Sequence, residues 1–180
     1  MKKKHIQDFV VKYLKENINK EDVVVDATIG NGHDTLLLAK LSKFVYGFDI
    51  QDQAYKNTEN LLKENNLTNY KLILDSHENI LKYVNDFKGI VFNLGYLPNS
   101  NKDITTTAET TVNTLKILTS FLKKNQFIIL TVYPNHEQGK LEAPAVLNFV
   151  STLDNGFHVL QYKLINYLNN PPFVIIIEKG

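Results

Sequence analysis

Apolar residues in this chain follow two alternating patterns, and the alternation predicts the order of its helices and strands. Short apolar runs rich in Val, Ile and Phe recur up to residue 132. Between them, apolar residues return every three or four positions, which is the spacing of one helix face. The short runs predict five strands, at 23–26, 44–49, 70–74, 89–94 and 127–132. The stretches between them predict helices around 6–14, 33–41, 54–65, 78–85, 108–122 and 146–153.

The end of the chain departs from this alternation. Two strand-like runs, 157–168 and 173–179, are joined only by residues 169–172, which read Asn-Asn-Pro-Pro. Because this link is too short for a helical crossover, we expect an antiparallel hairpin. The sequence therefore predicts a single α/β domain over residues 1–180. Its Rossmann-like sheet has seven strands, mostly parallel, with a C-terminal antiparallel hairpin and helices on both faces.

Composition is that of a folded protein and excludes several classes of site. The chain is 43% hydrophobic and 22% charged. Having 0 Cys, it has no disulfide, thiolate metal site or thiol nucleophile. The histidines show no ligand spacing, so we expect no metal. No apolar run approaches the ~18 residues of a membrane span, and no signal-peptide core follows the basic start. We expect a soluble cytoplasmic protein with no membrane partner.

Charge limits how this chain could read a nucleic acid. The formal net charge of +1 is too small to require such a partner, and all 20 basic residues are lysine. Lysine neutralises phosphate but lacks the planar fork with which arginine binds a guanine edge. If a nucleic acid is the substrate, base recognition through arginine is excluded.

The most informative motif follows the first strand, where Asp26 leads into a turn with Gly30 and Gly32. Glycine lets the backbone approach a ligand, and a helix starting near His33 directs free N–H groups into the same space. Asp49 ends the next strand, at the interval of about 20 residues that places a carboxylate on ribose hydroxyls. The pattern indicates a nucleoside-cofactor site, the alternative being a purely structural turn. Asp26 favours the cationic end of S-adenosylmethionine, because it would repel a pyrophosphate.

Polar residues also follow the third strand, in the segment Asp75-Ser76-His77-Glu78. In this fold that corner lies beside the adenine, so Ser76 and His77 could hydrogen-bond the base or the ribose. The alternative is a helix cap, since Asp75 and Ser76 are good N-cap residues and Glu78 suits a first helical turn. The two interpretations are compatible.

The fourth strand leads into Asn93-Leu94-Gly95-Tyr96-Leu97-Pro98. Amino-group methyltransferases carry Asp/Asn-Pro-Pro-aromatic at this point, where an acceptor side chain holds the attacking nitrogen and an aromatic ring stacks on the substrate. Asn93 and Tyr96 match these two roles and are our candidate catalytic residues, with Gly95 and Pro98 as substrate contacts. An ordinary Gly/Pro turn is the alternative.

A polar segment, residues 133–142, follows the fifth strand. Open α/β sheets bind substrates at the carboxyl ends of their strands. We therefore expect a substrate-binding loop that includes Tyr133, His136 and Glu142. His136 and Glu142 are also weak candidates for a general base. The alternative is a solvated loop and helix start.

Together these segments resemble the small class I S-adenosylmethionine-dependent methyltransferases labelled rRNA methylases. Characterised members of that family methylate the 5-aminomethyl group of wobble (2-thio)uridine in tRNA. The resemblance covers essentially the whole chain and implies a tRNA anticodon loop at the Asn93 and Tyr133 loops, and a homodimer. It also implies that S-adenosylmethionine is bound by Asn31, His33, Asp49, Gln51, Ser76 and His77.

Other functions stay open at this point. A ribosomal RNA or small-molecule amine methyltransferase would share the same motifs. A nicotinamide-dependent oxidoreductase is disfavoured by Asp26, by the closing hairpin, and by Thr35 in place of the third glycine of the dinucleotide pattern. A non-catalytic binding module that kept the fold is the remaining alternative.

Overall fold

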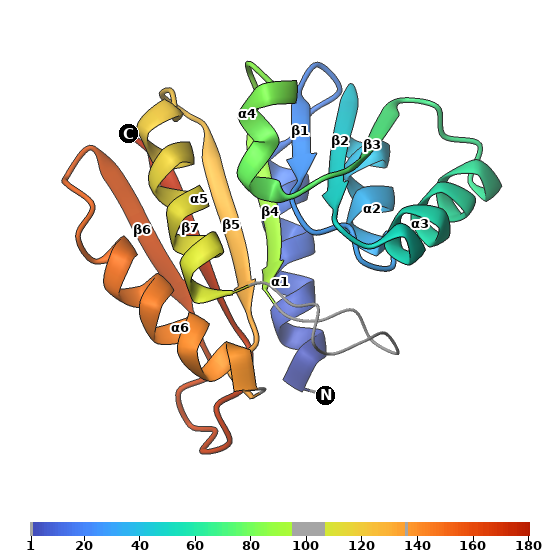
Figure 1. Cartoon of the computed structure of the whole chain (residues 1–180). Helices are drawn as coiled ribbons and strands as arrows, with labels where there is room; N and C mark the ends of the chain where they lie inside the picture. The colour runs from blue at the N-terminus through green and yellow to red at the C-terminus, as the bar shows by residue number, and fades with distance from the viewer. Residues whose placement is uncertain (1, 95–106, 136) are drawn as a thin grey trace. The chain divides into compact units, whose positions relative to one another are not determined.

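The structure is a computed structural model that describes residues 2–94, 107–135 and 137–180 (Figure 1). Its helices are α1 (Lys2–Asn17), α2 (His33–Leu41), α3 (Asp52–Glu64), η1 (His77–Asn79, a 3-10 helix), α4 (Ile80–Tyr83), α5 (Ala108–Phe121) and α6 (Glu137–Val150). Its strands are β1 (Val23–Asp26), β2 (Phe44–Asp49), β3 (Tyr70–Leu74), β4 (Gly89–Leu94), β5 (Phe127–Val132), β6 (Phe157–Tyr162) and β7 (Phe173–Lys179).

These strands form one seven-stranded sheet in the order β3-β2-β1-β4-β5-β7-β6. β1 runs parallel to β2 and β4, and β2 runs parallel to β3. β7 is antiparallel to both β5 and β6. The predicted fold class, a mostly parallel α/β sheet with an antiparallel C-terminal hairpin, is confirmed. Because β1, β2 and β3 are parallel neighbours, the motifs that follow them share one edge of the sheet.

The predicted end of β6 was wrong. The strand ends at Tyr162, and residues 163–172 connect it to β7. Tyr162 pairs with Val174, the second residue of β7. Pro171 and Pro172 precede β7 and have no N–H to donate to a ladder, so residues after Tyr162 find no partner strand. The apolar residues that suggested a longer strand are solvent-exposed, Ile165 at 90% and Leu168 at 96%.

The segment predicted as a polar loop after β5 is partly helical. α6 begins at Glu137 and contains Gly139 and Pro144. The polar residues of this segment favoured a loop, and glycine and proline usually mark a turn or the end of a helix. Burial explains the helix, because the face formed by Gly139, Glu142, Ala143, Val146 and Val150 is buried.

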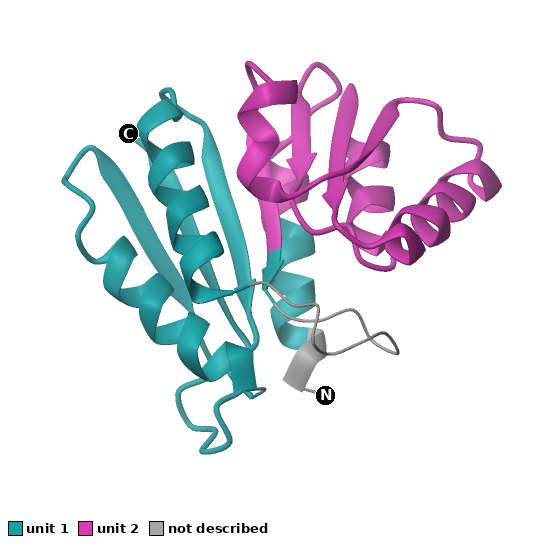
Figure 2. Ribbon diagram, in the orientation of Figure 1, with its two compact units in different colours: residues 1–12, 93–180 teal, residues 13–92 magenta. Residues whose placement is uncertain are grey.

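The chain divides into two compact units (Figure 2). Unit 2, residues 13–92, has a core in which Val24, Val25, Phe48 and Ile90 are fully buried. Unit 1, residues 1–12 and 93–180, has its own core, including Leu115, Ile128, Leu130, Val174 and Ile175. A single domain over the whole chain stays a prediction. No described helix has the length and apolar character needed to cross a bilayer.

Gly47 in β2 allows the turn after β1 to pack closely against the sheet. A Cβ atom at Gly47 would lie 2.7 Å from Ile29 Cγ2 and 3.0 Å from Leu72 Cδ2. Ile29 is 3% exposed, and its N–H donates to the carbonyl of Phe48 at 3.0 Å. The absence of a side chain at Gly47 therefore helps to set the position of the glycine turn.

We expect Gly47→Ala to lower the free energy of unfolding by about 1–3 kcal/mol, because the added methyl group overpacks a buried contact. Urea unfolding followed by circular dichroism measures this change. Gly156→Ala is the matched control, since its Cβ would meet the flexible side-chain ends of Asp154 and Lys179. That control should change stability by less than about 0.5 kcal/mol. Equal stability of the two variants would contradict the packing role of Gly47.

Candidate functional site

The turn between β1 and α2 is tied to the end of β2 by one carboxylate. Asp49 Oδ2 accepts a hydrogen bond from the N–H of Gly30 at 3.0 Å, and Oδ1 accepts one from the N–H of Gln51 at 3.0 Å. Burial raises the pKa of Asp49, while the backbone N–H groups of Gly30, Gln51 and Ile50 oppose the rise. A carboxylate oxygen has two lone pairs. The Asp49 carboxylate therefore retains the capacity to accept a further hydrogen bond, as from a ribose hydroxyl.

Backbone conformation favours glycine at both glycine positions of the turn, and close packing also requires it at Gly32. Both have positive φ, 51° at Gly30 and 81° at Gly32, which favours glycine. At Gly32, a Cβ would lie 2.7 Å from Thr58 Oγ1. Gly32 therefore lets the start of α2 pack against α3, which is the structural alternative considered for this turn.

Asp26 is fully buried at the start of the same turn. Its Oδ2 accepts from the Thr35 hydroxyl at 2.6 Å, and its Oδ1 accepts from the N–H of Thr28 at 3.2 Å. Burial, followed by the nearby carboxylate of Asp34, raises the pKa of Asp26 to about 7. The carboxyl group is thus held inside the turn by hydrogen bonds from Thr28 in the turn and Thr35 in α2. Its contact with a cofactor stays a prediction.

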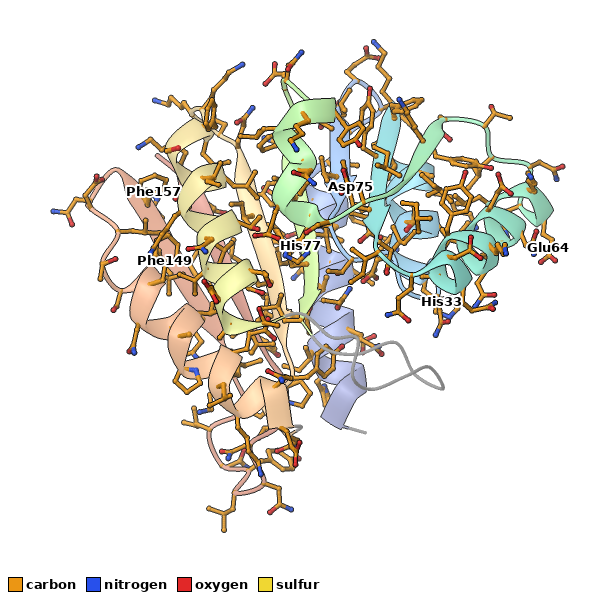
Figure 3. The ribbon with its side chains drawn as sticks, in the orientation of Figure 1. His33, Glu64, Asp75, His77, Phe149 and Phe157 are labelled. Carbon is orange, nitrogen blue, oxygen red and sulfur yellow. The ribbon has the colours of Figure 1, made fainter. Side chains whose placement is uncertain are left out.

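The segment after β3 contains Asp75 and His77 (Figure 3). Ser76 caps η1 by accepting from the N–H of Glu78 at 3.2 Å. Asp75 accepts hydrogen bonds from Asn79 Nδ2 at 2.8 Å and Tyr83 Oη at 2.9 Å, which lower its pKa. The capping alternative is therefore confirmed for Ser76.

His77 is 9% exposed, and its ring packs edge-on against Phe92, with centroids 5.6 Å apart. Burial lowers the pKa of His77, which favours the neutral imidazole. Its Nε2 is buried and has no hydrogen-bond partner within the described part of the chain. A buried polar atom without a partner is costly. A ligand that hydrogen-bonds Nε2 would remove this cost.

Two exposed apolar side chains, missed by the sequence reasoning, flank the carboxylate of Asp49. Ile50 directly follows it and is 58% exposed. Leu74 pairs with Asp49 across the β2–β3 ladder and is 52% exposed. Their signal in the sequence was an apolar residue next to an acid at each strand end, since Ile50 follows Asp49 and Leu74 precedes Asp75. A carboxylate beside apolar surface suits a nucleoside, which presents hydroxyl groups and a flat apolar base.

The remaining predicted cofactor residues lie at the same edge of unit 2. Asn31 is exposed in the turn. His33 is exposed at the start of α2 (Figure 3). Gln51 is half-buried, and its N–H is held by Asp49. The predicted cofactor residues all belong to unit 2 and lie at or after the ends of β1, β2 and β3: Asp26, Gly30, Asn31, Gly32, His33, Asp49, Gln51, Ser76 and His77. The buried Nε2 of His77, which has no partner among the described residues, and the half-buried carboxylate of Asp49 beside exposed Ile50 and Leu74 fit an adenosyl group.

The predicted substrate residues belong to unit 1. Asn93 is half-buried near the end of β4, and Tyr133 is half-buried just after β5. Glu142 lies within α6 rather than in a loop, is 0% exposed, and accepts from the Thr111 hydroxyl at 2.6 Å. It therefore connects α6 to α5. Gly95, Tyr96, Pro98 and His136 lie outside the described residues.

Known proteins are similar to this chain in sequence and in fold. Residues 45–178 match a family model described as "Putative rRNA methylase". A chloroplastic tRNA (mnm(5)s(2)U34)-methyltransferase of Arabidopsis thaliana is 33% identical over 180 residues, covering 90% of this chain and 65% of the plant protein. The chain thus spans just under two thirds of that relative's length.

Solved structures agree with the family model. A "putative rRNA-methylase" from Clostridium thermocellum is 38% identical, with a TM-score of 0.92 over 97% of each chain. A "putative methyltransferase" from Streptococcus mutans, solved in complex with SAH, is 38% identical, with a TM-score of 0.90 over 97% of this chain and 98% of that one. Because the family model matches well over half of the length of this chain, the chain belongs to the family described as "Putative rRNA methylase".

Proposed function

We propose that this protein transfers a methyl group from S-adenosylmethionine to the nitrogen of the 5-aminomethyl group on wobble (2-thio)uridine in tRNA. The main observation in support of this cofactor is the Asp49 carboxylate. It accepts hydrogen bonds from two backbone N–H groups and lies beside the exposed side chains of Ile50 and Leu74. The SAH bound to the Streptococcus mutans relative supports the same cofactor. The substrate is supported by the 33% identity to the plant tRNA methyltransferase.

The residues of unit 2 would hold the cofactor by complementary groups. Asp49 would accept hydrogen bonds from the ribose hydroxyls, and His77 Nε2 would gain the partner that it lacks among the described residues. Ile50 and Leu74 would cover the faces of the adenine. Asp26 would face the positively charged part of the cofactor, directly or through water. S-adenosylmethionine supplies an electrophilic methyl group on a positively charged sulfur, so the protein has mainly to position and desolvate the reactants.

The substrate amine has to be neutral when it attacks, since a protonated amine has no lone pair. We propose that the Asn93 side chain accepts a hydrogen bond from the amine and aims its lone pair, and that Tyr96 packs on the uracil ring. Gly95, Pro98, Tyr133 and His136 would complete the contacts with a splayed anticodon-loop nucleotide, as is usual in RNA recognition. Glu142 is fully buried against Thr111. It is therefore a weak candidate for a general base.

Deleting the gene in its host should cause the 5-aminomethyl nucleoside to accumulate in tRNA at the expense of the methylaminomethyl form. Mass spectrometry of nucleosides from purified tRNA measures both. A plasmid copy of the wild type should restore the methylated form, and a copy with Asn93→Ala should not. An unchanged nucleoside profile in the deletion strain would contradict the proposal that tRNA is the substrate.

Ribosomal RNA is the alternative substrate, and the family description favours it. Purified protein incubated with labelled cofactor and fractionated RNAs separates the two cases. Label in tRNA supports our proposal, and label in ribosomal RNA alone supports the alternative.

We also propose that the protein works in the cytoplasm as a homodimer, since the family resemblance implies two copies. Light scattering that returns the mass of one chain would contradict the dimer.

A further inference from the structure

The hydrogen bond between Asp26 and Thr35 joins two fully buried side chains in the glycine turn. Asp26 is the last residue of β1, and Thr35 lies in the first turn of α2. Thr35 Oγ1 donates to Asp26 Oδ2 at 2.6 Å, and both residues are 0% exposed. A distance of about 2.5–2.7 Å is typical of a hydroxyl that donates to an ionised carboxylate. The geometry therefore suits the charged form of Asp26.

The surroundings of Asp26 oppose that charge. Asp34 on α2 and Asp49 on β2 act on it as like charges. Its neighbours in the β1 ladders, Gly47 and Val91, carry no titratable group. Burial and the two acids raise the pKa of Asp26 to about 7, and the hydrogen bonds from Thr35 and Thr28 lower it. Near neutral pH, the cofactor-free protein therefore contains both forms of Asp26.

We propose that Thr35 is a positioning residue, whose hydroxyl holds Asp26 as the carboxylate that recognises a cationic cofactor. This inference rests on the proposed function, which places the positively charged end of S-adenosylmethionine at this turn. Thr35 does not itself touch the cofactor in this proposal. It acts through Asp26, because a donated hydrogen bond stabilises the charged form relative to the protonated form.

Cofactor affinity then depends on pH with a definite sign. A cation binds the ionised carboxyl, so below the pKa of Asp26 in the free protein binding has to release a proton. Protonation of Asp26 should therefore make affinity fall as pH drops through the region of 7. Removing the Thr35 hydroxyl raises the pKa of Asp26, so the fall should begin at a higher pH.

Thr35→Val tests this, because valine keeps the shape of threonine and removes the hydroxyl. Isothermal titration calorimetry with S-adenosylmethionine between pH 6 and 9 gives the dissociation constant at each pH. We expect the wild type to lose about tenfold in affinity between pH 8 and pH 6. In Thr35→Val the midpoint should move up by about one pH unit or more. The variant should then bind about five- to tenfold more weakly at pH 6–7 and about equally at pH 9.

Thr35→Ser is the matched control, because it keeps the hydroxyl and loses a methyl group. It should keep the midpoint of the wild type. Thermal unfolding of each variant establishes that it is folded. Calorimetric titration of the wild type in two buffers of different ionisation enthalpy measures the number of protons released on binding. This readout does not depend on any variant. At pH 7 the wild type should release about half a proton on binding.

Three results would overturn the role of Thr35: an unchanged midpoint in Thr35→Val, an equal loss of affinity at every pH, or no proton release by the wild type. The second result would assign Thr35 to packing alone. If the folded wild type fails to bind S-adenosylmethionine at any pH, the proposed function fails instead. The two failures are therefore distinguishable.

Discussion

Replacing Asp49 with alanine is expected to weaken binding of S-adenosylmethionine by at least about 100-fold. In our proposal the carboxylate accepts hydrogen bonds from two ribose hydroxyls, and a hydrogen bond to a charged group contributes roughly 1.5–3 kcal/mol. Two such bonds correspond to about a hundredfold or more in the dissociation constant. The loss of the bond from Gly30 N–H to Asp49 Oδ2 would also free the glycine turn. Isothermal titration calorimetry measures the effect directly.

The control for this variant is Asp52→Ala. Asp52 lies three residues further on, at the start of α3, where its exposed side chain pairs with Lys56. An exposed i,i+4 pair contributes little to stability, and Asp52 has no role in the proposed site. Its substitution should leave cofactor affinity within about twofold of the wild type. Normal cofactor affinity in a folded Asp49→Ala variant would contradict the proposed ribose contact.

Replacing Asn93 with alanine is expected to lower kcat by about 100-fold or more while leaving cofactor affinity within about threefold. The proposed role of Asn93 is to hold the amine in line with the methyl group. Loss of such positioning lowers the rate of a reaction by about this factor. The rate should be measured with saturating tRNA that carries the aminomethyl nucleoside. Cofactor affinity should be measured on the same preparation, because Asn93 is placed on the substrate rather than on the cofactor.

Two comparisons sharpen the Asn93 result. Asn93→Asp keeps an acceptor oxygen, and amino-group methyltransferases use either residue at this point, so it should retain most of the activity that alanine loses. Asn113→Ala, on the exposed face of α5, should behave as the wild type. If Asn93→Ala turns over at the wild-type rate, Asn93 has no part in positioning the amine.

The sequence determined most of the strands. β2, β3, β4 and β5 have the predicted bounds, because each is a short apolar run between polar segments and such a run has few other ways to be buried. α2 likewise begins and ends where the pattern predicts. The predicted end of β6 and the predicted loop after β5 were wrong, because the local residue pattern there did not indicate which residues would be buried. The polar residues of 133–142 favoured a loop, but α6 begins at Glu137, and its buried face includes Glu142.

For the candidate site, the sequence by itself identified the acids and glycines, because residues at parallel strand ends share one edge of the sheet. It could not give their surroundings. Only the tertiary structure showed that Thr58 fills the space beside Gly32, that His77 Nε2 lacks a partner among the described residues, and that Ile50 is exposed.

The pairing of Asp26 with Thr35 was also decided by tertiary structure. Burial, hydrogen bonding and pKa depend on atoms that come together only when β1, β2, α2 and α3 pack. The spacing of residues along the chain therefore indicates where such groups lie, whereas folding sets which of them are charged, buried or available to a ligand.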